Sequence, residues 1–356
     1  MNLYQKLKII AVFLVIVYMS ITAASAGTFT DLNQMINEAT TTLILSEDYT
    51  YDSSIDSSFN NGIIINKDLT IEGNGKTIDA RGQARIFMIP TGPEVTVKNI
   101  TFKNGYTTEA GGAILCTGEL TVKDCTFINN TAAAGGALFT TTLRLDIEDS
   151  AFKDNRASDA GGAVLTGEGV SITGSFFQNN TAPKGSIHLM NAVTNTNLLN
   201  YNMIIENGIA FYNNGTGTVN IDYNWWGDND SPLPKVTGPV EINNYYTMRL
   251  ASIDSPEYGE EYDFDYIFEL NDNGDHDSDL LPEFIADIKY NTELVDSIDG
   301  RYNKTLSTSI NTPGNNEIEV YLFNTSITSL SFEVKSDVGL NIEFSEENGT
   351  DRKSVV

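Results

Sequence analysis

Two aspartates, Asp124 and Asp149, are the residues whose type and spacing could support chemistry. Lys123 and Glu148 stand directly before them. Paired carboxylates act as acid, base or nucleophile in glycoside hydrolases, and carboxylate oxygens bind Ca²⁺. The functional interpretation is therefore a cation or sugar site. The structural alternative is that both aspartates cap a bend, because Asn99 precedes Asp124 by the same interval that separates the two aspartates.

A second group of oxygen ligands lies at residues 271–279, Asn-Asp-Asn-Gly-Asp-His-Asp-Ser-Asp. This segment lacks the EF-hand spacing and its closing glutamate, so the alternatives are a solvated turn and weak Ca²⁺ binding. The two histidines, His188 and His276, fall in different predicted domains, and His188 is expected to face outward or to be a hydrogen-bonded core residue. The histidines therefore suggest no zinc site and no histidine-based dyad, and we assign no metal ligands and no cofactor.

Aromatic residues stand near the end of the predicted repeat region. Tyr223, Trp225 and Trp226 could form a platform on which a sugar stacks, or they could cover the last coil of a repeat stack. Tyr245 and Tyr246 follow at the expected domain junction and are expected to pack it.

The two cysteines, Cys116 and Cys125, are too few to form a disulfide framework. Cys125 falls among small residues on the predicted inner face of the repeat, which favours a buried, inert thiol. A bond between Cys116 and Cys125 is the alternative.

These residues belong to a repeat. Three Gly-Gly-Ala triplets, beginning at residues 111, 135 and 161, alternate with phrases that open on a phenylalanine. The phenylalanines recur at one constant interval, at Phe102, Phe127, Phe152 and Phe177. A fixed period within the range of about 20–50 residues marks a stacked architecture in which no single unit can bury its apolar face alone.

Each unit is predicted to contribute a strand, a bend, a strand, a loop and a strand. Aliphatic residues stand seven and five positions before each phenylalanine with a polar residue between them, as in a strand with one face on a core. The bend position carries Asn99, Asp124, Asp149 and Gly174. The glycine pair allows a turn with positive φ, and another apolar strand follows it. The sequence therefore predicts one coil of a parallel β-helix per unit, with coils about 4.8 Å apart.

A corner of each coil carries Asn130, Asn155 or Asn180 in register. Asparagine tolerates left-handed backbone, and its amide can bond to the same amide one coil away. Asp154 lies in a separate corner column. Before the coils, residues 29–39 are predicted to form an amphipathic helix that caps the open end of the stack, with Asp31 as a candidate N-cap.

The ends and the charge limit the function. Residues 1–26 combine Lys6 and Lys8, an apolar run and Ala24-Ser25-Ala26, a pattern typical of a cleaved secretory signal; the alternative is an uncleaved anchor. The net charge is −27. It disfavours nucleic acid and anionic membranes as partners, and no membrane insertion is expected after signal cleavage.

Several Asn-x-Ser/Thr triplets fit a glycosylated surface protein, although chance occurrence in an Asn-rich chain is the alternative. They begin at Asn99, Asn129, Asn179, Asn214, Asn229, Asn303, Asn324 and Asn348.

The composition changes after about residue 244, where the repeat phrases disappear and short, spaced β segments with turn residues between them take their place. We therefore predict an all-β protein with a signal peptide (1–26), a right-handed parallel β-helix with an N-terminal capping helix (27–244), an immunoglobulin-like β-sandwich (245–340) and a C-terminal tail (341–356).

Residues 125–132, Cys-Thr-Phe-Ile-Asn-Asn-Thr-Ala, and 135–138, Gly-Gly-Ala-Leu, resemble repeats of adhesin-like surface proteins of methanogenic archaea. They are also similar to the repeats of chlamydial polymorphic outer-membrane proteins. Residues 73–79 and 223–228 look like the opening and closing phrases of the methanogen family. The resemblance implies a right-handed parallel β-helix, often followed by immunoglobulin-like modules, that is exposed on the cell surface and acts in adhesion.

The resulting hypothesis is an exported, non-enzymatic surface protein that binds a glycan or protein of another cell, or its own cell envelope, through the β-helix face. The alternatives are a polysaccharide lyase or glycoside hydrolase, because β-helices also host such enzymes, and a purely structural envelope protein.

Overall fold

The computed structural model describes residues 26–335 except 142–143, 168, 192–197, 273 and 275–276. The predicted signal segment up to residue 25 and the predicted tail lie outside the described residues. The chain divides into two compact units. The first extends to Met248 and also includes Phe268–Phe284 and Gly300–Tyr302, and the second comprises Arg249–Ile267, Ile285–Asp299 and the residues from Asn303 on. The chain thus returns to the first unit twice after leaving it, whereas the sequence predicts a single boundary between the two domains at residue 244.

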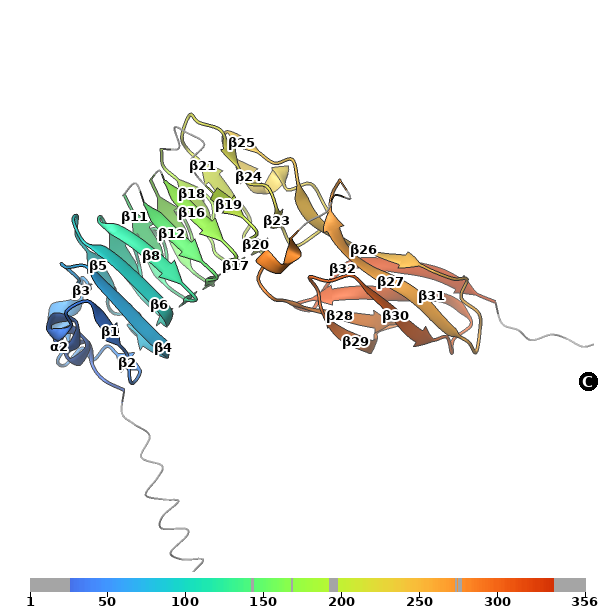
Figure 1. The fold of residues 1–356 in the computed structure, drawn as a ribbon, viewed down its shortest axis with the longest axis horizontal. Coiled ribbons are helices and arrows are strands. Elements are labelled where there is room, and N and C mark those ends of the chain that lie inside the picture. The colour runs from blue at the N-terminus through green and yellow to red at the C-terminus, as the bar shows by residue number, and fades with distance from the viewer. Residues whose placement is uncertain are drawn as a thin grey trace, which may run out of the picture. The chain divides into compact units, whose positions relative to one another are not determined.

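The first unit is a parallel β-helix, and its strands follow one another along the stack in three rows (Figure 1). The first row contains β1 (Thr42–Ile44), β4 (Leu69–Asp79), β6 (Glu94–Lys103), β8 (Glu119–Lys123), β12 (Leu145–Glu148), β16 (Val170–Thr173) and β19 (Leu198–Asn200). The second contains β2 (Tyr49–Thr50), the later parts of β4 and β6, then β9 (Thr126–Ile128), β13 (Ala151–Lys153), β17 (Phe176–Gln178), β20 (Met203–Ile205), β23 (Asn224–Trp225) and the start of β26 (Tyr245–Ser252).

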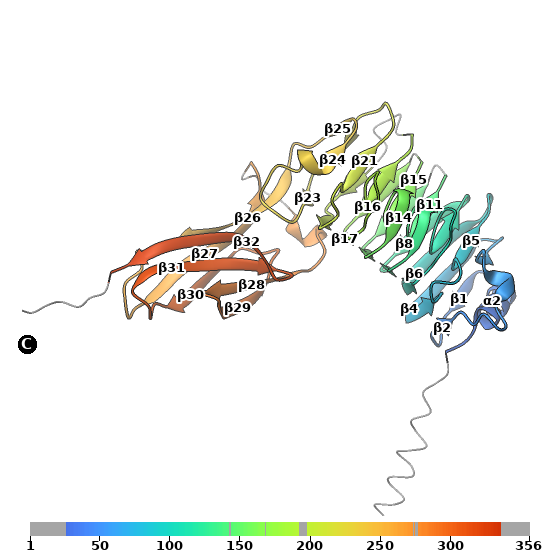
Figure 2. The ribbon, with the colours of Figure 1, turned by 180° about the vertical axis from the view of Figure 1, so that it is seen from behind.

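The third row is seen from behind in Figure 2. It contains β3 (Ile63–Ile64), β5 (Phe87–Ile89), β7 (Ile114–Cys116), β11 (Leu138–Thr140), β15 (Val164–Thr166), β18 (Ile187–Leu189), β21 (Phe211–Asn213) and β24 (Val236–Thr237). Two short parallel pairs, β10 (Thr131–Ala134) with β14 (Arg156–Ala160) and β22 (Val219–Asn220) with β25 (Val240–Glu241), and the 3-10 turns η1 (Ser57–Phe59), η2 (Leu233–Lys235) and η3 (Ser278–Leu280) complete the unit.

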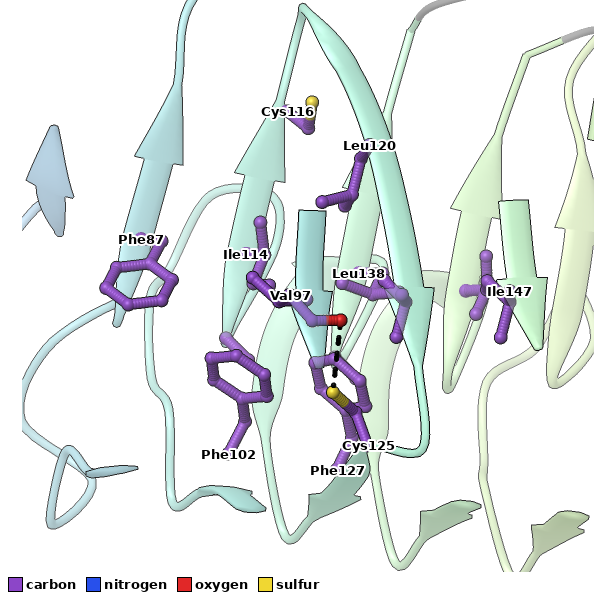
Figure 3. Packing of buried hydrophobic residues seen from close by; sticks show 14 of the residues in the cluster. Phe87, Val97, Phe102, Ile114, Cys116, Leu120, Cys125, Phe127, Leu138 and Ile147 are labelled. Carbon is purple, nitrogen blue, oxygen red and sulfur yellow. Dashed lines mark hydrogen bonds between the residues drawn. The ribbon is translucent and has the colours of Figure 1, made fainter. Parts of the chain in front are cut away.

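The core of the β-helix is built from the predicted columns. Phe102, Phe127, Phe152 and Phe177 are fully buried, and their rings stack with centroid separations of 4.8, 4.7 and 4.8 Å. These distances equal the spacing of parallel strands, so each ring repeats the position of its neighbour one coil away. Figure 3 shows the first rings of this column among the buried aliphatic residues. The predicted parallel β-helix is therefore confirmed.

An inner ladder of asparagine amides runs along one corner. Asn130 donates from Nδ2 to Asn155 Oδ1, and Asn155 donates to Asn180 Oδ1, each at 2.9 Å. Asn207 continues the ladder beyond the regular repeats. The prediction of left-handed backbone at this position is wrong: the positive φ lies one residue earlier, at Asn129, Asp154 and Asn179. The outer residue makes the turn, and the buried asparagine satisfies backbone groups inside it.

The glycine pairs behave as predicted. Gly111, Gly135 and Gly161 have φ of 69°, 60° and 63°. The second glycine of each pair is required for a different reason, because a Cβ atom at Gly136 would overlap the carbonyl oxygen of Gly162 in the next coil. Successive coils therefore touch backbone to backbone at this turn.

Helix α2 (Phe29–Glu38) lies at the first-coil end of the stack in both views (Figures 1 and 2). Its buried residues Phe29, Leu32 and Ile36 belong to the same hydrophobic cluster as the first strands. The predicted N-cap is wrong by three residues: Thr28 is the N-cap, and Asp31 completes a capping box by accepting a hydrogen bond from the Thr28 backbone N–H at 2.8 Å.

The second unit is antiparallel. One sheet has the order β29 (Glu293–Asp299), β28 (Ile285–Tyr290), β31 (Gly314–Leu322) and β32 (Thr325–Val334). The other pairs β27 (Glu261–Leu270) with β30 (Lys304–Ser309). Tyr262 from β27 contacts Phe332 from β32 with ring centroids 4.9 Å apart, so the two sheets face each other.

Candidate functional site

The two aspartates lie in a column of six bend residues that all have left-handed backbone, hereafter the bend column. Its members, in stack order, have φ of 50° at Asn99, 51° at Asp124, 47° at Asp149, 60° at Gly174, 57° at Tyr201 and 59° at Tyr223. The predicted bend is therefore confirmed, and both aspartates occupy bend positions. Asparagine, aspartate and glycine accept this conformation readily, but a bulky residue adopts it only when the surroundings impose it.

The two tyrosines are therefore unusual at these positions. Their rings stack 5.5 Å apart with an interplanar angle of 9°. Sequence reasoning missed Tyr201 because the coil length changes there. The backbone N–H of Ser175 donates to Asn202 Oδ1, 27 residues on, and the backbone N–H of Asn202 donates to Asn224 Oδ1, 22 residues on. The available signal is Asn-Tyr-Asn at residues 200–202 and Tyr-Asn-Trp at 223–225, which align once the period is relaxed.

A cleft of about 850 Å³ opens beside the bend column within the first unit, hereafter the cleft. Its walls come from the bend column, from the ends of β16 and β19, and from the segment that contains η3. The lining residues are Asp124, Asp149, Thr173, Gly174, Asn200, Tyr201, Asp279, Leu280, Leu281, Pro282, Glu283 and Arg301. The structure thus brings the predicted aspartates together with a tyrosine and with residues from much later in the chain.

The carboxylates of Asp124 and Asp149 give the cleft its charge. Both side chains are exposed, and among the described residues no protein group donates a hydrogen bond to either of them. Partial burial, followed by the nearby charge of Asp124, raises the pKa of Asp149 above its usual value. The Asp149 carboxylate leans over Gly174, because a Cβ atom at residue 174 would overlap Asp149 Oδ1.

The cations beside the cleft are already engaged. Lys123 Nζ donates to Glu148 at 3.0 Å. Arg301 is 9% exposed, donates to the Leu281 carbonyl oxygen at 3.3 Å and forms an ion pair with Glu283 at 3.3 Å. Arg301 therefore holds the wall of the cleft in place, and the excess charge of the lining is negative.

The aromatic face comes from Tyr201. One side of its ring stacks on Tyr223, while on the other side the next member of the bend column is Gly174, which has no side chain. Burial, followed by the charge of Asp277, raises the pKa of Tyr201, so its phenol stays protonated at neutral pH. The ring of Tyr201 and the carboxylates of Asp124 and Asp149 thus line the same cleft.

The two tryptophans do not form a sugar platform. Trp225 and Trp226 are 0% and 2% exposed. Trp225 stacks on Phe284 at 5.3 Å and meets Phe268 edge-on at 6.1 Å, and Tyr246 stacks on Phe268 at 5.1 Å. Trp225 instead lies within the stack, paired with Met203 on one side and with Tyr246 on the other, and Phe268 and Phe284 pack against it. Tyr223, the third predicted platform residue, is the one that reaches the bend column.

Both cysteines are free, buried thiols, which confirms the interpretation of Cys125 and excludes the alternative Cys116–Cys125 bond. Burial raises the pKa of Cys116 to about 11 and that of Cys125 to about 12. Cys125 Sγ donates to the carbonyl oxygens of Val97 and Lys123, and Figure 3 shows the first of these bonds inside the core. Thiols in this environment are poor nucleophiles at neutral pH.

His188 lies in β18 and is 4% exposed, stacked on Tyr212 with ring centroids 4.9 Å apart. Its Nδ1 lies 3.2 Å from the Lys184 carbonyl oxygen, and burial lowers its pKa. Of the acidic segment 271–279, Asn273, Asp275 and His276 lie outside the described residues. The described part of the chain contains no cluster of three or more His, Cys, Asp or Glu residues arranged to bind a metal ion.

Comparison with family models matches residues 43–200 to the family described as "Right handed beta helix region". The coiled part of the first unit is therefore a right-handed β-helix. No curated protein and no solved structure matches the chain. None of the helices in the described residues has the length and apolarity needed to cross a membrane.

Proposed function

We propose that this chain is an exported, non-enzymatic surface protein that binds a glycan through the face of its β-helix that carries the bend column. One observation carries the proposal: the cleft combines an aromatic ring, Tyr201, with two carboxylates, Asp124 and Asp149, that no group in the described part of the chain satisfies. Sugars are bound by this combination, because their C–H faces stack on aromatic rings while their hydroxyl groups donate to carboxylates.

The rigid β-helix that carries the bend column favours ligand binding without a conformational change. Each bend residue is fixed by its coil, and the neighbouring coils are joined by the asparagine ladder and the phenylalanine stack. A ligand that binds to such a preorganised face loses its own freedom but does not have to order the protein. Repeated coils also present equivalent positions along one direction, which suits an extended polymer.

The remaining assignments belong to the same proposal. Residues 1–26 act as the export signal, α2 closes the open end of the stack, and the second unit is an immunoglobulin-like sandwich that serves as a spacer or second binding module. Its two facing sheets support that interpretation. The resemblance of the repeats to adhesin-like surface proteins supports a place at the cell surface.

A polysaccharide-cleaving enzyme is the second candidate. The observation in its favour is the raised pKa of Asp149 next to a second carboxylate, which is the arrangement that separates an acid from a base in glycosidases. Against it, the cleft has no free cation in its described lining to assist a lyase, because Arg301 and the nearby Lys123 are bonded to acids.

The test is to incubate the full chain with neutral, amine-bearing and acidic polysaccharides and to follow both retention of the protein and shortening of the glycan. Retention without shortening is expected. Shortening that Asp149→Asn abolishes would replace the proposal with the enzyme. Failure to be retained on any glycan would remove glycan binding and leave an envelope role.

A further inference from the structure

We infer that the folded chain accepts an N-linked glycan at Asn214, in the loop that joins β21 to β22. The acceptor triplet is Asn214-Gly215-Thr216, and the sugar donor is a lipid-linked sugar diphosphate used by a membrane-bound transferase. This inference rests on the export that the proposed function includes, because N-linked glycans are added to exported chains.

Most of the other Asn-x-Ser/Thr triplets in the described residues lie partly in strands. The hydroxyl residue of the triplet belongs to β6, β10, β30 or β32 at Thr101, Thr131, Thr305 and Ser326. In the triplet that begins at Asn179, the middle residue, Asn180, is fully buried and bonded within the inner ladder. A transferase has to hold the whole triplet, so each of these segments would first have to leave its coil or sheet.

The triplet that begins at Asn229 lies outside the strands, but its amide is engaged. Asn229 Nδ2 donates to the Met248 carbonyl oxygen at 2.7 Å, and Asn229 Oδ1 accepts from the Met248 backbone N–H at 2.8 Å. These two bonds tie Asn229 to β26. A transferase that takes this amide would have to break both.

The triplet at Asn214 is free of both obstacles. Residues 214–218 belong to no strand or helix, and the side chains of Asn214 and Thr216 are exposed. Asn214 Nδ2 donates to the Met190 carbonyl oxygen over a long 3.4 Å, and a glycosylated amide keeps one N–H that can still make this bond. Exposed loop tips of this kind are where enzymes that modify folded proteins gain access.

The loop is held at its base by Asn213, which is 2% exposed. Its Nδ2 donates to the carbonyl oxygens of Gly217 at 2.8 Å and Pro239 at 2.7 Å, and its Oδ1 accepts from the Gly215 backbone N–H at 2.8 Å. The loop follows a strand of the third row, whereas the bend column follows strands of the first row. A glycan on Asn214 therefore stands at a different corner of the coil from the bend column.

The transfer is a substitution at the anomeric carbon of the donor sugar. Asn214 Nδ2 forms a bond to that carbon while the bond from the carbon to the diphosphate oxygen breaks. The diphosphate leaves on its lipid with the bonding electrons, and the amide gives up one proton to the transferase.

The experiment incubates the folded full chain with membranes that contain an oligosaccharyltransferase and its lipid-linked donor, under conditions in which a free peptide of residues 210–220 is modified. Mass spectrometry of proteolytic fragments measures the glycan at each triplet. The site variants are Asn214→Gln and Thr216→Ala, and Thr216→Ser restores the hydroxyl group. The matched control is Thr218→Ala, which removes an exposed hydroxyl group of the same loop outside the triplet.

We expect Asn214 to carry at least tenfold more glycan than any other triplet of the folded chain. Asn214→Gln and Thr216→Ala should abolish this modification, whereas Thr216→Ser and Thr218→Ala should retain it. A folded chain that stays unmodified at Asn214 would overturn the inference, and so would equal modification of Asn129, because the exposed loop would then not select the site. Asn214→Gln should still be retained on any polysaccharide that retains the parent chain, so the inference can fail while the proposed function stands.

Discussion

Asn155 contacts both neighbouring coils through one side chain: its Nδ2 donates to Asn180 Oδ1 at 2.9 Å, and its Oδ1 accepts from the backbone N–H of Asn130 at 3.0 Å. The same Nδ2 also donates to the Phe127 carbonyl oxygen at 2.9 Å. The amide therefore satisfies backbone groups of a fully buried corner, and it does so for two coils at once.

Replacing Asn155 by alanine should consequently lower the free energy of unfolding by about 3 kcal/mol, because several buried polar groups lose their partners at once. Denaturant titration of the full chain measures this loss. The control is Asn129→Gly, which keeps the left-handed turn and removes one exposed hydrogen bond, and should lose less than about 1 kcal/mol. Equal losses for the two variants would mean that the inner ladder adds nothing beyond the turn.

An outer ladder runs beside the inner one and is interrupted. Asn104 donates to Asp79 at 2.9 Å, Asn129 donates to Asn104 at 2.8 Å, and Asn179 donates to Asp154 at 2.5 Å. The Asp154 carboxylate has no N–H with which to donate to Asn129 Oδ1, so the ladder of side-chain hydrogen bonds is interrupted between Asn129 and Asp154.

Asp154→Asn should close the interruption and raise the free energy of unfolding by about 0.5–1 kcal/mol. The reverse change, Asn129→Asp, places a second carboxylate against an acceptor and should lower it by a similar amount. Thermal melts of both variants provide the comparison. If the two changes shift the melting temperature in the same direction, the ladder does not govern the stability of this corner.

How far the sequence predicts the fold depends on the period. Phe127, its three equivalents and the Gly-Gly-Ala turns keep a near-constant spacing, so the core columns and the bends follow from that spacing alone. The sequence does not predict Tyr201 as a bend residue, because the coils around it are longer or shorter than the regular period and the repeats no longer align there. Arg301 and the segment around Leu280 could not be placed at all, since no local pattern indicates that a chain returns to a stack it has left.

The N-cap of helix α2 is a smaller error of the sequence prediction, which places it at Asp31 where the structure has Thr28. Asp31 has the side chain of an N-cap, but Thr28 three residues earlier has one as well, and local propensity cannot choose between them. The choice is made by packing: Phe29 must be helical to bury its ring, and Asp56 accepts hydrogen bonds from the backbone N–H groups of Phe29 and Thr30.

The glycine turns permit a sharper test of backbone packing. Gly136→Ala places a Cβ atom against the carbonyl oxygen of Gly162, a backbone atom that cannot move without opening the coil. We expect a loss of more than about 3 kcal/mol or failure to accumulate soluble protein. Gly75→Ala is the matched control: its φ is 75° and nothing lies within 4 Å of the new atom, so it should lose only about 1 kcal/mol. Similar melting temperatures for the two variants would exclude close coil packing at Gly136.

Alkaline pH should destabilise the β-helix through its two thiols. Burial raises the pKa of Cys116 to about 11 and of Cys125 to about 12, from an ordinary value near 9. The folded state therefore keeps protons that the unfolded state releases. The resulting stability is complete below about pH 9 and is lost as the pH rises towards 11–12, by about 1.4 kcal/mol per pH unit for each thiol.

Denaturant titrations at pH 7, 8.5 and 10 measure the slope of this loss. The double variant Cys116→Ala, Cys125→Ser should show a smaller slope than the parent between pH 8.5 and 10, because neither replacement titrates in this range. Serine suits the second position because Ser150 and Ser175 occupy it in the next coils. An unchanged slope in the double variant would assign the alkaline loss to the buried tyrosines instead.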